Sequence, residues 1–224
     1  MQKYSVFSLI KNAFSNHQNW EVAWKDPTPK SEYDVVIIGG GGHGLATAYY
    51  LAKEHNIRNV AIIEKGWIGG GNVGRNTTII RSNFMYDANA RFNEFGMDLW
   101  RNLSQELNFN VMFSPRGIIN LAHSDAQMNA YARRGNSMRL NGIDAKLLDR
   151  DEVKKLIPMA DFSDEVRFPI FGGLMQPSAG TARHDAVAWG YARQADDMGV
   201  DIIQHCEVTG FDVVNGKIKG IRTS

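Results

Sequence analysis

Residues 33–64 read YDVVIIGGGGHGLATAYYLAKEHNIRNVAIIE, and this segment indicates the fold more clearly than any other part of the chain. The apolar run Val35–Ile38, which glycines follow, is typical of a strand that is buried on both faces of a parallel sheet. Gly39, Gly41 and Gly44 match the pattern G-x-G-x-x-G. The first glycine of this pattern allows a tight turn, the second lets a pyrophosphate approach the backbone, and the third lets the helix pack closely on the strand.

A helix and a second strand are expected after the glycines. Leu45, Ala48 and Ala52 recur at helical spacing, and the first N–H groups of such a helix favour the binding of phosphate. Residues 60–63 predict the second strand, and Glu64 ends it about 20 residues after the glycines, where a carboxylate can accept from ribose hydroxyls. The order predicts an α/β fold that binds a dinucleotide. A glycine-rich loop without a ligand is the alternative.

Residues 65–81, KGWIGGGNVGRNTTIIR, are too rich in glycine and polar residues for a regular helix or strand. Backbone amides, together with Asn and Thr side chains, can line the polar edge of an isoalloxazine ring and its ribityl chain. In a nicotinamide-dependent dehydrogenase, a further helix and strand usually follow the acidic residue directly. The segment therefore favours FAD over NAD, with an ordinary surface loop as the alternative.

The composition is that of an ordinary soluble globular protein, with 224 residues, 43% hydrophobic and 22% charged. The net charge of +1 gives no electrostatic reason to expect nucleic acid or an anionic membrane as a partner. Cys206 is the single cysteine, so no internal disulfide can form, and we expect a buried structural thiol rather than a nucleophile. No apolar run approaches the roughly 20 residues that span a bilayer. Without a recognisable signal peptide, we expect a cytoplasmic protein.

Residues 1–32 are predicted to form an interface arm. Apolar residues from Val6 to Phe14 recur at helical spacing among basic residues, and Trp20 and Trp24 add aromatic surface before a proline-containing segment. Exposed aromatic groups of this kind are typical of interface anchors. A transit peptide is the alternative, because the segment is basic and has few acids.

The remaining residues predict two domains. Residues 33–108 and 177–224 are assigned to the dinucleotide-binding domain, and 109–176 to part of an α+β lobe that would contribute to a substrate cavity. The periodicity predicts helices at 88–107 and 125–140 and one that starts at Asp149, strands at 111–122, 166–176 and 200–208, and a hairpin of 211–214 and 217–222 around Asn215-Gly216.

A further helix is expected to begin within residues 177–185, with Ser178 or Thr181 as its cap and His184 in its first turn. The helix dipole disfavours protonation there, so the neutral and nucleophilic imidazole is populated. On general histidine chemistry, a hydrogen-bonded structural role is the ordinary expectation for His184.

Three segments together resemble the β subunits of heterotetrameric sarcosine oxidases, within the wider family of FAD-dependent D-amino-acid and N-methylamino-acid oxidases. They are Gly39–Gly44, residues 69–81 and Ala182-Arg183-His184-Asp185, and the resemblance extends over essentially all 224 residues. It implies a Rossmann-like FAD-binding domain of the GR2 type with a partial substrate lobe. It also implies noncovalent FAD, and FMN joined covalently to His184. The implied FAD-contacting residues are Gly42, His43, Glu64, Lys65, Asn72, Arg75, Asn76, Thr77, Thr78, Ile80 and Val208.

The resemblance also implies an activity and partners. FAD would take a hydride from sarcosine, FMN would pass the electrons to oxygen, and the products would be glycine, formaldehyde and hydrogen peroxide. Partner α, γ and δ subunits are implied, with tetrahydrofolate on the α subunit taking up the one-carbon unit. Arg81 resembles the arginine that receives the substrate carboxylate, since a guanidinium can hold a carboxylate bidentately. A surface ion pair is the alternative for Arg81.

The chain ends at Ser224, where such subunits are about half complete. The closing glycine motif of the FAD domain and the lysine that partners the arginine are therefore missing, and we expect an amino-terminal fragment or a truncated gene. Three other functions stay open: a simpler FAD-dependent amine or D-amino-acid dehydrogenase with a structural His184, a noncatalytic flavin-binding module, and a nicotinamide-dependent dehydrogenase. One arginine does not distinguish sarcosine from dimethylglycine, proline or a D-amino acid.

Overall fold

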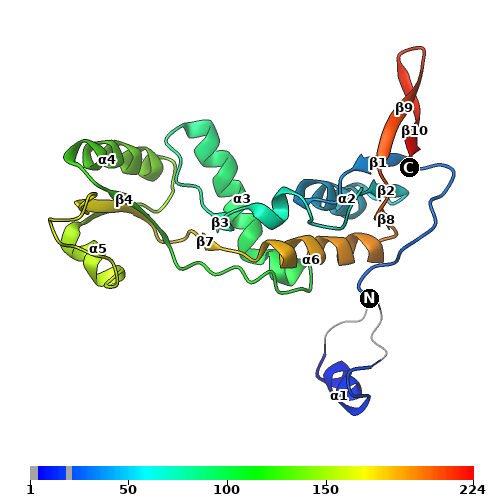
Figure 1. The fold of residues 1–224 in the computed structure, drawn as a ribbon, viewed down its shortest axis with the longest axis horizontal. Helices are drawn as coiled ribbons and strands as arrows, with labels where there is room; N and C mark the ends of the chain where they lie inside the picture. The colour runs from blue at the N-terminus through cyan, green and yellow to red at the C-terminus, as the bar shows by residue number, and fades with distance from the viewer. Residues whose placement is uncertain (1–4, 19–21) are drawn as a thin grey trace. The chain divides into compact units, whose positions relative to one another are not determined.

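The computed structural model describes residues 5–18 and 22–224, which form two compact units (Figure 1). The first unit contains the residues up to Thr77, together with 105–111 and 183–224, and the second contains 78–104 and 112–182. These limits differ from the predicted domains mainly at residues 78–104, which we assigned to the dinucleotide-binding domain. The reason is that Ala90, within this segment, is buried in the core of the second unit.

The first unit is built on a three-stranded parallel sheet with the order β1-β2-β8. Its strands are β1 (Val35–Ile38), β2 (Val60–Ile63) and β8 (Asp201–Ile203). Two helices, α2 (Gly42–His55) and α6 (His184–Asp197), pack against each other and against the sheet. The predicted order of strand, glycine turn, helix and strand is therefore confirmed.

The two strands predicted to be buried on both faces differ in their exposure. All four residues of β2 are buried, as expected for the middle strand. In β1, however, Val36 is 36% exposed and Ile38 is 54% exposed. The prediction is wrong for β1, because this strand lies at the edge of the sheet and one of its faces is not covered by described residues.

A hairpin covers part of the sheet face that α2 and α6 leave open. It consists of β9 (Val208–Val214) and β10 (Lys217–Thr223), joined by Asn215 and Gly216, which both have positive φ angles (Figure 1). Val208 and Ile221 pack against the buried Ala61, Ile63 and Ile203, and so does the half-buried Cys206. The predicted hairpin and the structural role of the thiol are therefore both supported.

The predicted arm contains one helix within the described residues. This helix, α1 (Val6–Phe14), begins with a capping box of Ser5 and Ser8 and buries none of its residues. Trp20 lies outside the described residues. Of the helices in residues 5–18 and 22–224, none is long and apolar enough to cross a membrane.

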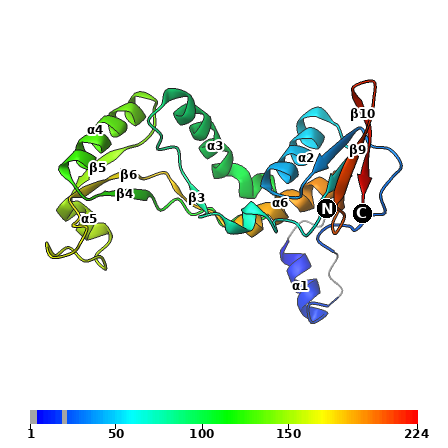
Figure 2. The ribbon, with the colours of Figure 1, turned by 45° about the horizontal axis from the view of Figure 1, so that its top comes forward.

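The second unit is a sheet between two helices. Its antiparallel strands have the order β4-β6-β5, namely β4 (Ile118–Ala122), β6 (Gly172–Gln176) and β5 (Lys146–Asp149). The helices α4 (Asp125–Leu140) and α5 (Arg150–Leu156) lie on opposite faces of this sheet (Figure 2). The remaining elements are α3 (Asp87–Glu106), whose last two residues belong to the first unit, and the short pair β3 (Ile79–Ile80) and β7 (Gly180–Thr181).

Helices of this unit were predicted more accurately than its strands. The helix at 125–140 and the cap at Asp149 are confirmed, since Asp149 forms a capping box with Glu152. The strand predicted at 166–176 is confined to the residues from Gly172 onward, and the strand predicted at 111–122 to those from Ile118 onward. In the first unit, the strand predicted at 200–208 stops at Ile203, because His205 adopts a φ of +54°.

Candidate functional site

The glycine turn after β1 has the geometry that its sequence predicts. Gly39 has a φ of +108°, a backbone conformation that only glycine adopts readily. A Cβ atom on Gly44 would lie 2.1 Å from the Gly39 carbonyl oxygen. Only a residue without a side chain therefore lets α2 start this close to the strand.

The N-terminus of α2 has no side-chain cap. Gly41 is the N-cap residue and has an extended backbone, and as a glycine it has no side chain that could accept from the N–H groups of the first turn. The N–H groups of this turn carry a partial positive charge of about half a unit. They form the kind of site that accepts a phosphate oxygen.

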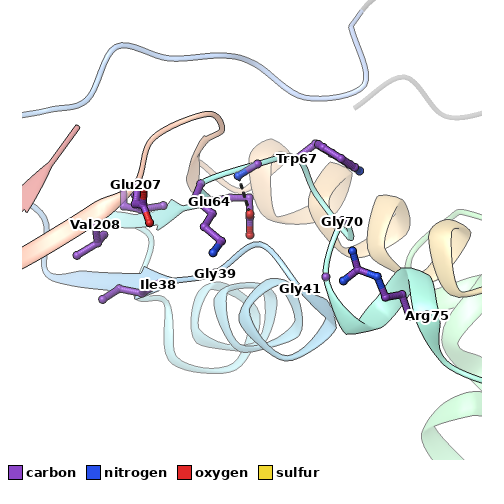
Figure 3. A pocket seen from close by; sticks show the side chains of 13 residues that line it. Ile38, Gly39, Gly41, Glu64, Trp67, Gly70, Arg75, Glu207 and Val208 are labelled. Atoms are coloured by element: carbon purple, nitrogen blue, oxygen red, sulfur yellow. Dashed lines mark hydrogen bonds between the residues drawn. The ribbon is translucent and has the colours of Figure 1, made fainter.

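Glu64, at the end of β2, is held by two backbone amides. Its Oε2 accepts from the Gly40 amide at 2.7 Å, and its Oε1 accepts from the Gly66 amide at 2.8 Å. The second of these hydrogen bonds is drawn in Figure 3. Each carboxylate oxygen can still accept a second hydrogen bond, so the fixed carboxylate remains able to bind hydroxyl groups.

These groups border a cavity of about 670 Å³ within the first unit (Figure 3). This size lies within the usual range of small-molecule sites, roughly 300–1,000 Å³. Six of the predicted cofactor-binding residues line it, namely Gly39, Gly41, Glu64, Lys65, Arg75 and Val208. The structure thus brings together the glycine turn, the acidic end of β2, the following loop and the start of β9.

Several residues at this cavity had no prediction of their own. Trp67 lines the cavity and is 64% exposed, and the exposed Glu207 lines it beside Val208. The other unpredicted lining residues are Ile38, Ile63, Gly66, Gly70 and Gly71. Glycines in the loop after β2 could have indicated the backbone positions, but no sequence signal points to Glu207.

The loop after β2 is tied to the glycine turn. Gly69 donates from its amide to the Gly40 carbonyl at 3.0 Å, and Gly74 donates to the Gly69 carbonyl at 3.1 Å. As predicted, the segment is mostly irregular, with one short 3-10 helix, η1 (Asn72–Arg75), before β3.

Other predicted cofactor-binding residues do not line this cavity. In the first unit, His43 is exposed on α2, and Gly42, Gly44, Asn72, Asn76, Thr77 and His184 are also outside the lining. Thr78, Ile80 and Arg81 belong to the second unit. Contact of these residues with a cofactor stays a prediction.

His184 lies in the first turn of α6, as predicted, and is the first residue of this helix, but the cap differs. Arg183 is the N-cap residue and makes no side-chain cap hydrogen bond, whereas Ser178 binds Asp144 instead. Arg183 donates to Asp185 at 2.8 Å, and this guanidinium holds the pKa of the Asp185 carboxyl below its usual value. The Nδ1 atom of His184 is buried and has no hydrogen-bond partner among the described residues.

Arg81 follows β3 in the second unit and is half-buried. Its Nη1 donates to Oδ1 of Asn83, and its guanidinium lies over the Phe84 ring, 4.9 Å from the centroid. The alternative of a surface ion pair is not supported, since none of the ion pairs formed by residues 5–18 and 22–224 includes Arg81. The positive charge therefore faces a neutral amide and an aromatic ring.

Comparison with known proteins agrees with this geometry. Residues 34–224 match the model of the family described as FAD dependent oxidoreductase. The chain belongs to this family. A Rossmann-like turn followed by a fixed acidic residue is what dinucleotide binding requires, and the predicted fold class is confirmed.

Two relatives of this chain carry the same name. Sarcosine oxidase subunit beta of Rhizobium meliloti is 60% identical over 99% of this chain and 53% of its own length. The protein of the same name from Rhodobacter capsulatus is 52% identical over the whole chain and 54% of its own length. The crystal structure of L-proline dehydrogenase from P. horikoshii has a TM-score of 0.79 and 30% identity, and the match covers 88% of this chain and 50% of that one. This chain spans about half the length of the curated relatives it matches.

Proposed function

We propose that this chain is the FAD-binding half of a sarcosine oxidase β subunit and contributes to the oxidation of sarcosine to glycine and formaldehyde. The observation that carries the proposal is the identity of 60% over 99% of the chain with a sarcosine oxidase subunit beta. The bound flavins would supply the redox chemistry: two electrons and two protons leave the N–CH₃ group, oxygen becomes hydrogen peroxide, and water hydrolyses the imine.

The cavity of the first unit suits the ADP portion of FAD. The uncapped N-terminus of α2 would receive the pyrophosphate, and Lys65 and Arg75 would add positive charge at the cavity wall. Glu64 would accept from the ribose hydroxyls, and the backbone of Val208 would meet the adenine. The contacts proposed for the rest of the flavin are those predicted for Gly42, His43, Asn72, Asn76, Thr77, Thr78 and Ile80.

Arg81 would bind the carboxylate of the amino-acid substrate. Its guanidinium has no acidic partner among the described residues, so it can form a bidentate pair with an incoming carboxylate. Such a pair fixes one end of the substrate and thereby orients the methyl carbon for hydride transfer.

His184 would hold FMN covalently. A buried polar atom without a partner costs about 1–3 kcal/mol, which supports a ligand at the orphaned Nδ1 edge of this ring. His184 is also the first residue of α6, so its ring lies at the N-terminal end of this helix. The proposed partners are the α, γ and δ subunits, with tetrahydrofolate on the α subunit as the one-carbon acceptor and the arm of residues 1–32 at an interface.

The test is acid precipitation of the protein co-expressed with its candidate partner subunits, followed by peptide mass mapping of any flavin in the pellet. We expect an FMN-sized mass increment on the His184 peptide, which is lost in His184→Ala. His55→Ala, which removes an exposed histidine at the end of α2, is the matched control and should retain the increment.

Other outcomes would identify a different function. A colourless pellet below a yellow supernatant would mean that only noncovalent flavin is present, and the simpler FAD-dependent amine or D-amino-acid dehydrogenase would replace the proposal. Flavin that sarcosine does not bleach would indicate a noncatalytic module.

A further inference from the structure

Asn83 contacts Arg81 and is completely buried. Its Oδ1 accepts from Nη1 of Arg81, so one N–H of the guanidinium is fixed by the protein. The other donors of a guanidinium lie in the same plane, so fixing one of them, with the Phe84 ring beside the group, restricts the directions of the rest. Asn83 therefore determines where Arg81 can present its charge.

Two neighbours hold Asn83 in place through three hydrogen bonds. Its Nδ2 donates to Oδ1 of Asn120 on β4 at 2.7 Å. Its backbone carbonyl accepts from Nε of Arg134 on α4 at 2.6 Å and also from Nη2 of the same guanidinium. Because Arg81 can only donate, these contacts leave a single orientation for the Asn83 amide.

The residue before Asn83 is fixed in a similar way. Ser82 is completely buried, and its amide donates to Oε1 of Gln176 at 3.0 Å. Its hydroxyl accepts from Nε2 of Gln176 at 2.7 Å and donates to Oε2 of Glu94 at 2.6 Å. A buried network with its partners satisfied is rigid, so the backbone beside Arg81 is anchored from α3, α4, β4 and β6.

Among the described residues, no carboxylate pairs with the two arginines of the cluster, since Glu94 binds Ser82 and Arg101 instead. Arg134, like Arg81, takes part in no ion pair within the described parts of the chain. Burial, and secondly the positive charge of Arg81, lower the pKa of Arg134. Two guanidiniums thus lie close enough to repel each other, and the groups that fix them are uncharged amide and carbonyl oxygens.

We propose that Asn83 is a positioning residue for substrate recognition: its neutral amide fixes the Arg81 guanidinium without neutralising it, which leaves the charge for the substrate carboxylate. This inference rests on the proposed function, in which Arg81 binds that carboxylate. A carboxylate at position 83 would have almost the same shape, but it would pair with Arg81 and compete with the substrate.

The test is Asn83→Asp in the assembled oxidase, with sarcosine and its uncharged amide, sarcosinamide, as substrates. We expect the KM for sarcosine to rise about 10- to 100-fold, the range for a lost charge-assisted interaction, with little change in kcat. Oxidation of sarcosinamide should be unchanged, because it has no carboxylate. Asn89→Asp, at an exposed position on α3, is the control for added charge and should react as the unmodified enzyme does.

A second variant covers the case in which Asn83→Asp does not assemble. Asn120→Ala frees the Asn83 amide without adding charge, and we expect a smaller loss, about 3- to 10-fold in kcat/KM, for sarcosine alone. Equal losses for sarcosine and sarcosinamide would overturn the inference, because a purely structural role affects both substrates.

Arg81→Met separates this inference from the proposed function. If Arg81→Met removes the preference for sarcosine over sarcosinamide but the Asn83 and Asn120 variants do not, the positioning role fails and the role of Arg81 stands. If Arg81→Met also leaves the preference unchanged, the carboxylate binds elsewhere and the proposed role of Arg81 fails with it.

Discussion

Glu64 and Arg81 are two charged side chains predicted to contact a ligand, and the protein fixes them by different means. The Glu64 carboxylate accepts from the backbone amides of Gly40 and Gly66, which lie 24 and two positions away in the sequence. The amide of Asn83 holds Arg81, and its own partners Asn120 and Arg134 are 37 and 51 positions away. The first arrangement is contained within one sequence motif, whereas the second depends on the tertiary packing of the second unit.

This difference determines how each site can be disrupted. The Glu64 site consists mainly of backbone, so a substitution affects it by moving the backbone or by changing the carboxylate itself. The Arg81 site consists of side chains, so single polar substitutions such as Asn83→Asp change its hydrogen bonds directly.

The largest expected effect is that of Gly44→Ala. The new Cβ would lie 2.1 Å from the Gly39 carbonyl oxygen, so the strand and α2 must separate. We expect the free energy of unfolding to fall by about 3 kcal/mol, and the affinity for FAD to fall as well, because the first turn of α2 is moved away from its place after the glycine turn. Fluorescence titration with FAD and thermal unfolding measure both quantities.

The matched control for this prediction is Gly96→Ala on α3. A Cβ there meets no atom within 4 Å, and alanine in a helix stabilises it by about 0.5–1 kcal/mol relative to glycine. Retention of FAD binding by Gly44→Ala would show that the close approach of α2 to β1 is not needed for the site.

A smaller effect is expected for Glu64→Gln. The amide NH₂ group cannot accept from a backbone N–H, so one of the two hydrogen bonds to Gly40 and Gly66 is lost. We expect the Kd for FAD to rise about tenfold, which corresponds to about 1.4 kcal/mol. Glu207→Gln removes an exposed carboxylate at the same cavity and should change the Kd by about twofold at most. Equal effects of the two substitutions would mean that overall charge, rather than the fixed geometry of Glu64, controls FAD binding.

The sequence predicts the first unit well where the physical cause is local. The turn at Gly39, the close packing at Gly44 and the hairpin at Asn215-Gly216 each follow from backbone conformations that few residues adopt. In the second unit, helix α4 likewise begins and ends at the predicted residues, and Ser124 caps its start.

The rest depends on contacts that are distant in the sequence. The runs of β1 and β2 have almost the same composition, yet only β2 is fully buried, because burial depends on the order of strands in the sheet. Similarly, the partners of Asn83 come from two other elements, and no local pattern relates them to Arg81. Glu207 reaches the cavity only because the β9–β10 hairpin packs on the sheet.

The smallest expected effect concerns the ion pair of Arg183 and Asp185 beside His184, in which charge is exposed rather than enclosed. Arg183 is the main cause of the lowered pKa of Asp185, so the folded state binds a proton less readily than the unfolded chain. This contribution to stability is present above the unfolded pKa of about 3.9, and it is lost as the pH falls through the lower folded value.

Because the Arg183 side chain is 61% exposed, the pair should contribute about 0.5 kcal/mol or less. We therefore expect Asp185→Asn to lower the free energy of unfolding in urea by a few tenths of a kcal/mol at pH 7. Toward pH 3, the free energies of unfolding of the variant and the unmodified protein should converge. A difference that grows as the pH falls would contradict this sign, and it would mean that the Asp185 carboxyl is stabilised in its protonated form.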